Sequence, residues 1–446
     1  MKSLARALAA LSVVLGGLVL YHPRQGQSRL LVAKLLACAL AAYGTLAGMV
    51  GTTLSLIFRM PNSFVVGALG TLVLGRYFRR VTAPHDEMRR AFGPDWEGRI
   101  SPEAAPRMLA RRWTWWLRTG QAAGHQRDVV FAIVPDSGRP LLCDVWQPPK
   151  GITPTGLVFI YLHGGYWHFF DKDTGTRTFF RHLAGQGHVV MDVAHRLSPE
   201  VALPGMMGDV LRAILWMKEN SEGYGVNPGR GVIGGASSGA HLALLAGYAT
   251  GHPRLIPNDL RGADLSVRAV VSYYGSPDLR PAETSTGEVD VAPPGRTMGA
   301  KSSEPERPAT NARGVWMAKD LGTASSDVAK ATRRRRARVL SREQLMVNLL
   351  GGPFQEIPEM YAVASPITHV KPGCPPTLIF QGEHDSLVPV DAARALHHKL
   401  VEAGVPVVYV ELPRTEHAFD LILPRISPPA QSSFYDLDRF LALMTG

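Results

Sequence analysis

The sequence predicts an α/β fold in which a mostly parallel β-sheet is covered by helices on both faces and preceded by apolar N-terminal helices. Three observations predict it. From about residue 127, apolar runs alternate with helical patterns of 10–15 residues, as in strands joined by crossover helices. A Gly-x-Ser-x-Gly pattern lies between one of these strands and a helix. The first eighty residues contain long runs with almost no charge.

The elements of the expected sheet follow one another through residues 127–446. Strands are expected at 127–134, 141–148, 156–165, 188–197, 232–233, 267–275, 375–385 and 405–412. Helices are expected at 178–187, 205–225, 240–249 and 390–404. In sheets of this kind the chemistry gathers at the carboxyl ends of the strands. The motifs described next all fall at such ends.

The stretch "VIGGASSGAHLA" (232–243) predicts a nucleophile elbow. It contains Gly235, Ala236, Ser237, Ser238 and Gly239, with a strand before them and a helix after them. The glycines allow a sharp turn and a close approach of the backbone. Strand, tight turn and helix is the context in which this pattern exposes a nucleophilic serine. We expect Ser237 to be the nucleophile; the alternatives are Ser238 and a packing role for Ser237.

A nucleophilic serine needs a base and an acid that orients the base. Asp385 lies in "GEHDSLVP", after one expected strand, and His417 lies in "PRTEHAFD", after the next. The order Ser237, Asp385, His417 differs from the orders of the two common protease types. We expect these residues to form a triad, with Glu383 as the alternative acid.

The stretch "YLHGGYW" predicts the donors that stabilise an oxyanion. Gly164 and Gly165 directly follow an expected strand, and glycine amides face inward without interference from a side chain. Together with the backbone N–H of Ser238, they would form the oxyanion hole. His163 is expected to anchor this loop.

No metal and no organic cofactor are implied by the remaining polar residues. The other histidines lack metal-ligand spacing and paired carboxylates: His168, His182, His188 and His195. His241 is expected on a helix face. Three scattered cysteines, Cys38, Cys143 and Cys374, form neither a disulfide framework nor a zinc pattern.

Residues 1–80 are expected to be a membrane anchor of two or three apolar helices. Uncharged runs cover 4–21 and 35–58, and a third run, 64–75, is short for a span. A signal peptide and a buried helical hairpin are the alternatives. The formal charge of +11 suits an anionic partner. Membrane lipid is favoured over nucleic acid because no nucleic-acid module is found. Basic residues lie at both ends of the runs, so the side of the membrane is open.

Two further segments lie before and within the expected catalytic domain (127–446). Residues 81–126 predict a helical linker or cap, in which Trp113 and Trp116 lie one helical turn apart. The stretch 281–340 is rich in proline, serine and glycine and is expected to be a disordered insert that interrupts the cap. It ends in "KATRRRRARVL", either a solvated charge run or a contact with anionic lipid. Short helices are expected beyond it, in 343–352 and 357–366.

The motifs "HGGYW", "AHRLSPEVALPGMMGDV", "GASSGAHLA", "GEHDSLVP" and "EHAFD" occur in this order. With them, residues 127–446 resemble the hormone-sensitive-lipase-like carboxylesterases of the α/β-hydrolase superfamily. The resemblance implies the α/β-hydrolase fold and a Ser-His-Asp triad that cleaves carboxylic esters. Three positions depart from the family pattern: Tyr166 replaces a third glycine, His195 a tyrosine and Ala236 an aspartate. These departures point toward prenylcysteine methylesterases or kynurenine-formamidase-like hydrolases.

We therefore expect a membrane-anchored serine carboxylesterase acting on small-molecule esters with short to medium or lipid-like acyl groups. An acyltransferase that uses the same triad and a catalytically silent, membrane-tethered binding module are the alternatives. The complete triad argues against the silent module. The substrate, the membrane side and the oligomeric state are left open.

Overall fold

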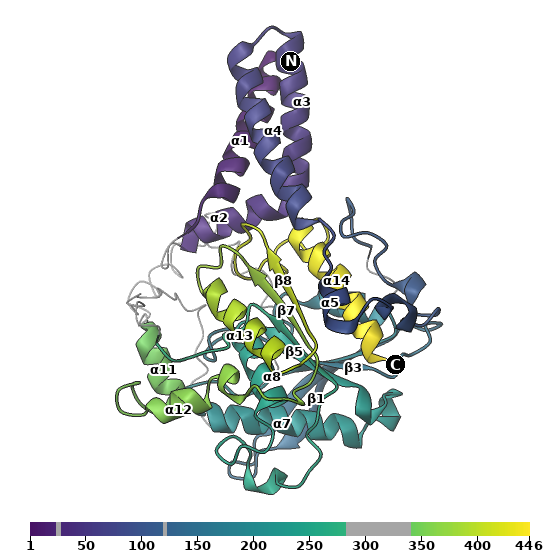
Figure 1. The fold of residues 1–446 in the computed structure, drawn as a ribbon, viewed down its shortest axis with the longest axis vertical. Helices are drawn as coiled ribbons and strands as arrows, with labels where there is room; N and C mark the ends of the chain where they lie inside the picture. Colours follow the sequence, from purple (N-terminus) through teal and green to yellow (C-terminus); the bar gives the residue numbers. More distant parts are fainter. Residues whose placement is uncertain (24–27, 119–122, 282–339) are drawn as a thin grey trace, which may run out of the picture.

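The mostly parallel sheet predicted from the sequence is confirmed. The computed structural model describes residues 1–23, 28–118, 123–281 and 340–446 (Figure 1). Its eight strands lie in the order β1-β2-β4-β3-β5-β6-β7-β8. β2 pairs antiparallel with β1 and with β4, and the other neighbouring strands are parallel. The strands are β1 (Gly124–Ile133), β2 (Pro140–Gln147), β3 (Val158–Leu162), β4 (Val189–Val193), β5 (Gly231–Ala236), β6 (Ala269–Tyr273), β7 (Thr377–Gly382) and β8 (Val407–Leu412).

Helices cover both faces of this sheet, because its central strands bury side chains on both sides. In β3, Ile160 packs into one core and its neighbour Phe159 into the other, as the alternation of a strand requires. The first core is covered by α7 (Leu203–Glu219), α8 (Ser238–Tyr248) and α13 (Val390–Glu402). The second is covered by α6 (Arg177–Gly185) and α14 (Pro428–Met444). The predicted helices of the domain are thereby confirmed.

Short helices fill the connections. Those expected beyond the insert are α11 (Arg342–Leu350) and α12 (Pro358–Val363). The 3₁₀ helices are η1 (Trp96–Arg99), η2 (Ala105–Arg107), η3 (Glu222–Tyr224), η4 (Pro228–Arg230), η5 (Asn258–Leu260) and η6 (Pro366–His369). Nearly all of the insert expected at 281–340 lies outside the described residues.

The N-terminal residues form a helical stalk that rises from the sheet domain (Figure 1). Its helices are α1 (Lys2–Leu20), α2 (Ser28–Ala39), α3 (Ala41–Ile57) and α4 (Pro61–Val81). α1, α3 and α4 run side by side, and α2 lies across the foot. Glycines permit the close packing: a Cβ at Gly48 would lie 2.4 Å from Thr71 Oγ1, and one at Gly70 would lie 2.4 Å from Ser12 Oγ. Small residues at helix contacts are typical of membrane bundles.

The stalk differs from the sequence prediction in two ways. The apolar run 35–58 is not one straight helix, because Leu30–Ala39 and Ala41–Ile57 meet at a bend of 73°. The third run belongs to a longer helix, since α4 has 21 residues. Among the described residues, Lys2–Leu20 is long and apolar enough to cross a membrane, and the bent pair adds a second candidate if it forms one span.

The described part of the linker contains one α-helix, α5 (Glu87–Phe92). The prediction of a helix around Trp113 and Trp116 is wrong. The described residues 111–118 contain only bends and irregular chain. Tertiary contacts of Trp113 determine this conformation. Its indole N–H donates to the Ile426 carbonyl at 2.9 Å, and its ring packs edge-on against Phe78 and Trp115.

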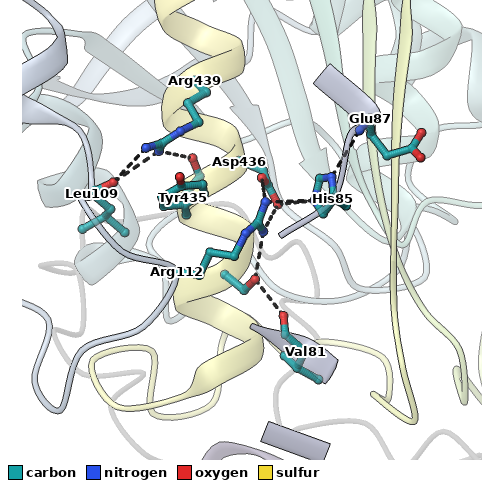
Figure 2. A network of polar contacts seen from close by, with 9 residues as sticks. Val81, His85, Glu87, Leu109, Arg112, Tyr435, Asp436 and Arg439 are labelled. Atoms are coloured by element: carbon teal, nitrogen blue, oxygen red, sulfur yellow. Dashed lines mark hydrogen bonds and ion pairs between the residues drawn. The ribbon is translucent and has the colours of Figure 1, made fainter. Parts of the chain in front are cut away.

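A buried ion-pair network holds the linker on α14 (Figure 2). The Arg112 guanidinium donates to both carboxylate oxygens of Asp436, at 2.6 and 2.7 Å. His85 Nε2 lies 3.0 Å from the same carboxylate. Ser432 accepts a hydrogen bond from Arg112 and donates one to the carbonyl of Val81, the last residue of α4. The network therefore joins the linker, the stalk and the sheet domain.

Candidate active site

Ser237 occupies a strained turn between β5 and α8. Its backbone has φ 54° and ψ −121°, a combination that residues with a side chain rarely adopt. Backbone strain of this kind is found mainly at functional sites. The glycine on each side allows close packing on β3, because a Cβ at Gly235 or Gly239 would lie 2.4 or 2.1 Å from the Leu162 carbonyl oxygen. Ser237 is partly exposed, whereas Ser238 is buried and its hydroxyl has no hydrogen-bond partner among the described residues. Strand, strained turn and helix are the arrangement expected of a nucleophile elbow centred on Ser237.

Asp385 and His417 lie in contact after β7 and β8. Asp385 Oδ2 is 2.8 Å from His417 Nδ1, and both side chains are buried. The other carboxylate oxygen, Oδ1, accepts the backbone N–H groups of Leu387 and Val388 at 2.9 and 2.8 Å. These bonds fix the orientation of the carboxylate, so that Oδ2 faces the imidazole.

Glu383, the alternative acid, is engaged elsewhere. Its Oε2 accepts the backbone N–H of Arg414 at 2.7 Å. The contact of Asp385 with His417 therefore favours Asp385 as the residue that orients the imidazole.

The charge of Asp385 changes the basicity of His417. Burial lowers the pKa of His417, but the charge and hydrogen bond of Asp385, together with two further carboxylates, outweigh burial, so the pKa lies above the ordinary histidine value. Glu416 and Asp420 add to the increase. A histidine with this pKa and a fixed Nδ1 partner is suited to accept a proton at Nε2.

Tyr274 and Asp420 complete the surroundings of the imidazole and were not identified from the sequence. The Tyr274 ring centroid lies 4.3 Å from that of His417, and its hydroxyl donates to Asp420 Oδ1. Burial raises the pKa of Asp420 to about 6, although the Tyr274 hydrogen bond opposes the increase. The sequence signal that could have identified them was their position along the chain, because Tyr274 directly follows β6 and Asp420 lies within "EHAFD".

Ser237 is connected to this group through β6. Its backbone N–H donates to the Tyr273 carbonyl at 2.9 Å, and the next residue, Tyr274, packs on His417. The carboxyl ends of β5, β6, β7 and β8 are neighbours in the sheet. The three predicted triad positions therefore follow strands that end at the same edge.

The loop after β3 lies directly against the elbow. A Cβ at Gly164 would lie 2.9 Å from the Ala236 carbonyl oxygen and 3.2 Å from Ser237 Cβ. In the part of the chain that the structure describes, no protein acceptor takes the backbone N–H of Gly164 or Gly165. Ser238 is the first residue of α8, so its amide has no acceptor within that helix. These three donors are available to a ligand.

His163 holds the loop by uncharged contacts. Its Nδ1 lies 2.8 Å from the Gly164 carbonyl oxygen, and its ring stacks on that of His195 at 4.4 Å. Burial, assisted by His195, lowers the pKa of His163 to about 3. His163 is therefore neutral at physiological pH. His241 is a buried helix residue that accepts from Trp167 at 3.2 Å and contacts the Ala364 carbonyl at 2.7 Å.

The chain is similar to several known esterases. The family model described as BD-FAE matches residues 143–317 and 323–400. The chain is 29% identical over 308 residues to LipM of Mycobacterium tuberculosis, which covers 69% of this chain and 59% of LipM. It is 28% identical over 351 residues to esterase LipQ of the same organism, covering 76% of this chain and 69% of LipQ. The solved structure of butyrate-bound esterase 2 of Thermogutta terrifontis aligns at TM-score 0.49 and 19% identity, covering 72% of this chain and 94% of that chain.

Proposed function

Because the chain belongs to the BD-FAE family of α/β-hydrolase esterases, we propose that it is a serine carboxylesterase that hydrolyses carboxylic esters of small molecules. The esterases LipQ and LipC of Mycobacterium tuberculosis are relatives at 28% and 27% identity. The chain spans 59% of LipM and 60% of LipC. The single observation that carries the proposal is the buried 2.8 Å contact between Asp385 and His417, in loops at the edge of the sheet where β5 leads into Ser237.

In the proposed reaction, Ser237 Oγ attacks the ester carbonyl carbon and His417 Nε2 takes the hydroxyl proton. The amides of Gly164, Gly165 and Ser238 bind the oxyanion, and each such donor is typically worth about 10²–10³ in rate. The ester C–O bond breaks, and the alcohol leaves with the proton from His417. Water then attacks the acyl carbon of the acyl-enzyme, its proton passing to His417. The bond from that carbon to Ser237 Oγ breaks, Oγ takes the proton from His417, and the carboxylic acid is released.

We further propose that the stalk anchors this enzyme in a membrane. Basic residues lie at both ends of the stalk, with Lys2 and Arg59 at one end and Arg76, Arg79 and Arg80 at the other. Between these ends, the outer surfaces of α1, α3 and α4 carry exposed apolar side chains, including Val14, Met49 and Leu72. In water such a surface would be unfavourable. In a bilayer it is the expected surface of a spanning bundle.

The nucleophile is tested with a fluorescent fluorophosphonate, which forms a covalent bond with an activated serine. We expect the full-length chain in membranes to be labelled and the Ser237→Ala variant to be unlabelled. Ser238→Ala removes the neighbouring hydroxyl but keeps the backbone amide, and it should still be labelled. Persistent labelling of Ser237→Ala, with loss of labelling in Ser238→Ala, would move the nucleophile to Ser238.

A further inference from the structure

Helix α2 at the foot of the stalk exposes apolar side chains, unlike a helix on the surface of a water-soluble protein. Leu30, Val32 and Leu36 are exposed by 41%, 36% and 38%, whereas Leu35 packs into the second core. Its lysine, Lys34, is fully buried. Lysine is almost never buried unless it is paired. Both the exposed apolar side chains and the buried lysine of α2 therefore require a physical explanation.

The buried side of α2 contacts the loop that carries Asp385. Lys34 Nζ donates to His384 Nδ1 at 2.7 Å and to the Tyr21 carbonyl. The His22 ring stacks on the His384 ring at 4.5 Å. Burial, together with the charge of Lys34, lowers the pKa of His384 to about 4, so the imidazole is neutral and its Nδ1 accepts from the lysine. α2 is thus held against the residue next to Asp385.

A second stalk contact reaches the loop that carries His417. The Tyr77 hydroxyl of α4 lies 3.0 Å from Thr415 Oγ1. The foot of the stalk therefore touches the loops of both the proposed acid and the proposed base. In Figure 1, α2 lies directly above the ends of β7 and β8.

The surroundings of α2 have the composition of a membrane–water boundary. Trp115 and Trp116 are exposed by 52% and 58%, and Tyr43, near the start of α3, donates its hydroxyl to the Trp115 carbonyl. Tryptophan and tyrosine are enriched at this boundary. The exposed arginines of the last turns of α4 lie at the same end of the stalk: Arg76, Arg79 and Arg80. Their charge complements anionic headgroups.

From these contacts, we propose that the outer face of α2 lies in the headgroup region of a bilayer with anionic lipids, and that the esterase takes an amphiphilic ester directly from that surface. This inference rests on the proposed function, since the ester is the one that Ser237 would attack. When α2 lies in the headgroup region, the contacts of the stalk hold Asp385 and His417 at the depth where a lipid ester group lies. The apolar face of α2 provides the contact with the acyl chains.

The position of α2 is tested first without any enzymatic readout. A nitroxide is attached to Leu36→Cys in the full-length chain, reconstituted in vesicles of phosphatidylcholine and phosphatidylglycerol. The native cysteines are buried, so the added thiol should react selectively. We expect the nitroxide to collide more often with lipid-soluble oxygen than with an aqueous nickel complex. The matched control is Val401→Cys on α13, which is exposed by 56% and should show the reverse. Aqueous accessibility at Leu36 would overturn the proposal even if the protein is an esterase.

The substrate class is tested by comparing two esters in the same vesicles. Leu30→Asp combined with Leu36→Asp should lower hydrolysis of a long-chain ester held in the bilayer by about tenfold. Hydrolysis of soluble p-nitrophenyl acetate should be unchanged, and Val401→Asp should alter neither rate. Equal loss on both esters would indicate a structural role for α2, and no loss on either would show that its face is not used; both results overturn the proposal. No soluble hydrolysis by the unmodified protein would instead refute the proposed function.

Discussion

Replacing Asp385 by asparagine tests the proposed triad through the direction of two hydrogen bonds. Asp385 Oδ1 accepts two backbone N–H groups, from Leu387 and Val388. In the Asp385→Asn variant these donors require the amide oxygen at that position. The NH₂ group then takes the place of Oδ2, which in the unmodified protein also accepts the Gln381 side-chain N–H at 2.8 Å. Facing His417 Nδ1, this group donates instead of accepting. The imidazole must carry its proton on Nε2, and it can no longer take one from Ser237.

The size of this effect follows from the role of the lost acceptor. Substitution of the aspartate in a serine-protease triad lowers kcat by about 10⁴ through the wrong histidine tautomer. We expect a similar loss of kcat/KM on p-nitrophenyl butyrate, equivalent to about 5 kcal/mol in the activation free energy.

The pH profile gives an independent readout. His417 acts as a neutral base, so activity rises as the pH increases through its pKa. In the unmodified enzyme this pKa is raised by Asp385, and the acid limb should lie above the ordinary histidine value. In Asp385→Asn burial dominates, and the limb should move to lower pH.

Glu383→Gln is the matched control. The glutamine oxygen can still accept the Arg414 N–H, so activity should remain close to that of the unmodified enzyme. Activity of Asp385→Asn within tenfold of normal, together with a large loss in Glu383→Gln, would refute the assignment of Asp385 as the acid.

Two further substitutions test the oxyanion loop and the linker. Gly164→Ala places a Cβ 2.9 Å from the Ala236 carbonyl oxygen, so the loop must shift, and kcat should fall by about 10²–10³. The control is Gly185→Ala on α6, where a Cβ meets nothing within 4 Å and the kinetics should stay normal. Normal activity of Gly164→Ala would contradict the oxyanion role. Arg112→Met leaves Asp436, which is 1% exposed, without its main cation, and should lower the free energy of unfolding by about 3–5 kcal/mol. Adding Asp436→Leu should recover much of that loss in thermal unfolding followed by intrinsic fluorescence; no difference between the single and double variants would rule out a buried-charge penalty.

Local patterns in the sequence determined the strands, the helices between them and the strained turn at Ser237. Each depends on residues within one short stretch: apolar runs for β3 or β7, and flanking glycines for the turn. The chain order of Ser237, Asp385 and His417 predicted positions at the ends of neighbouring strands, because parallel strands end at one edge of the sheet. These features require no knowledge of distant contacts.

Tertiary structure alone decided the features whose partners lie far away along the chain. Residues 111–118 are not helical, because Trp113 and Arg112 bind groups near and within α14. Lys34 is buried because His384 accepts its hydrogen bond, and the aromatic contact of Tyr274 with His417 joins two strand ends. The bend between α2 and α3 lies within an apolar run that composition predicted as one segment. In each case a specific long-range contact outweighs the weak local preference of the chain, and such contacts exist only once the sheet has brought these segments together.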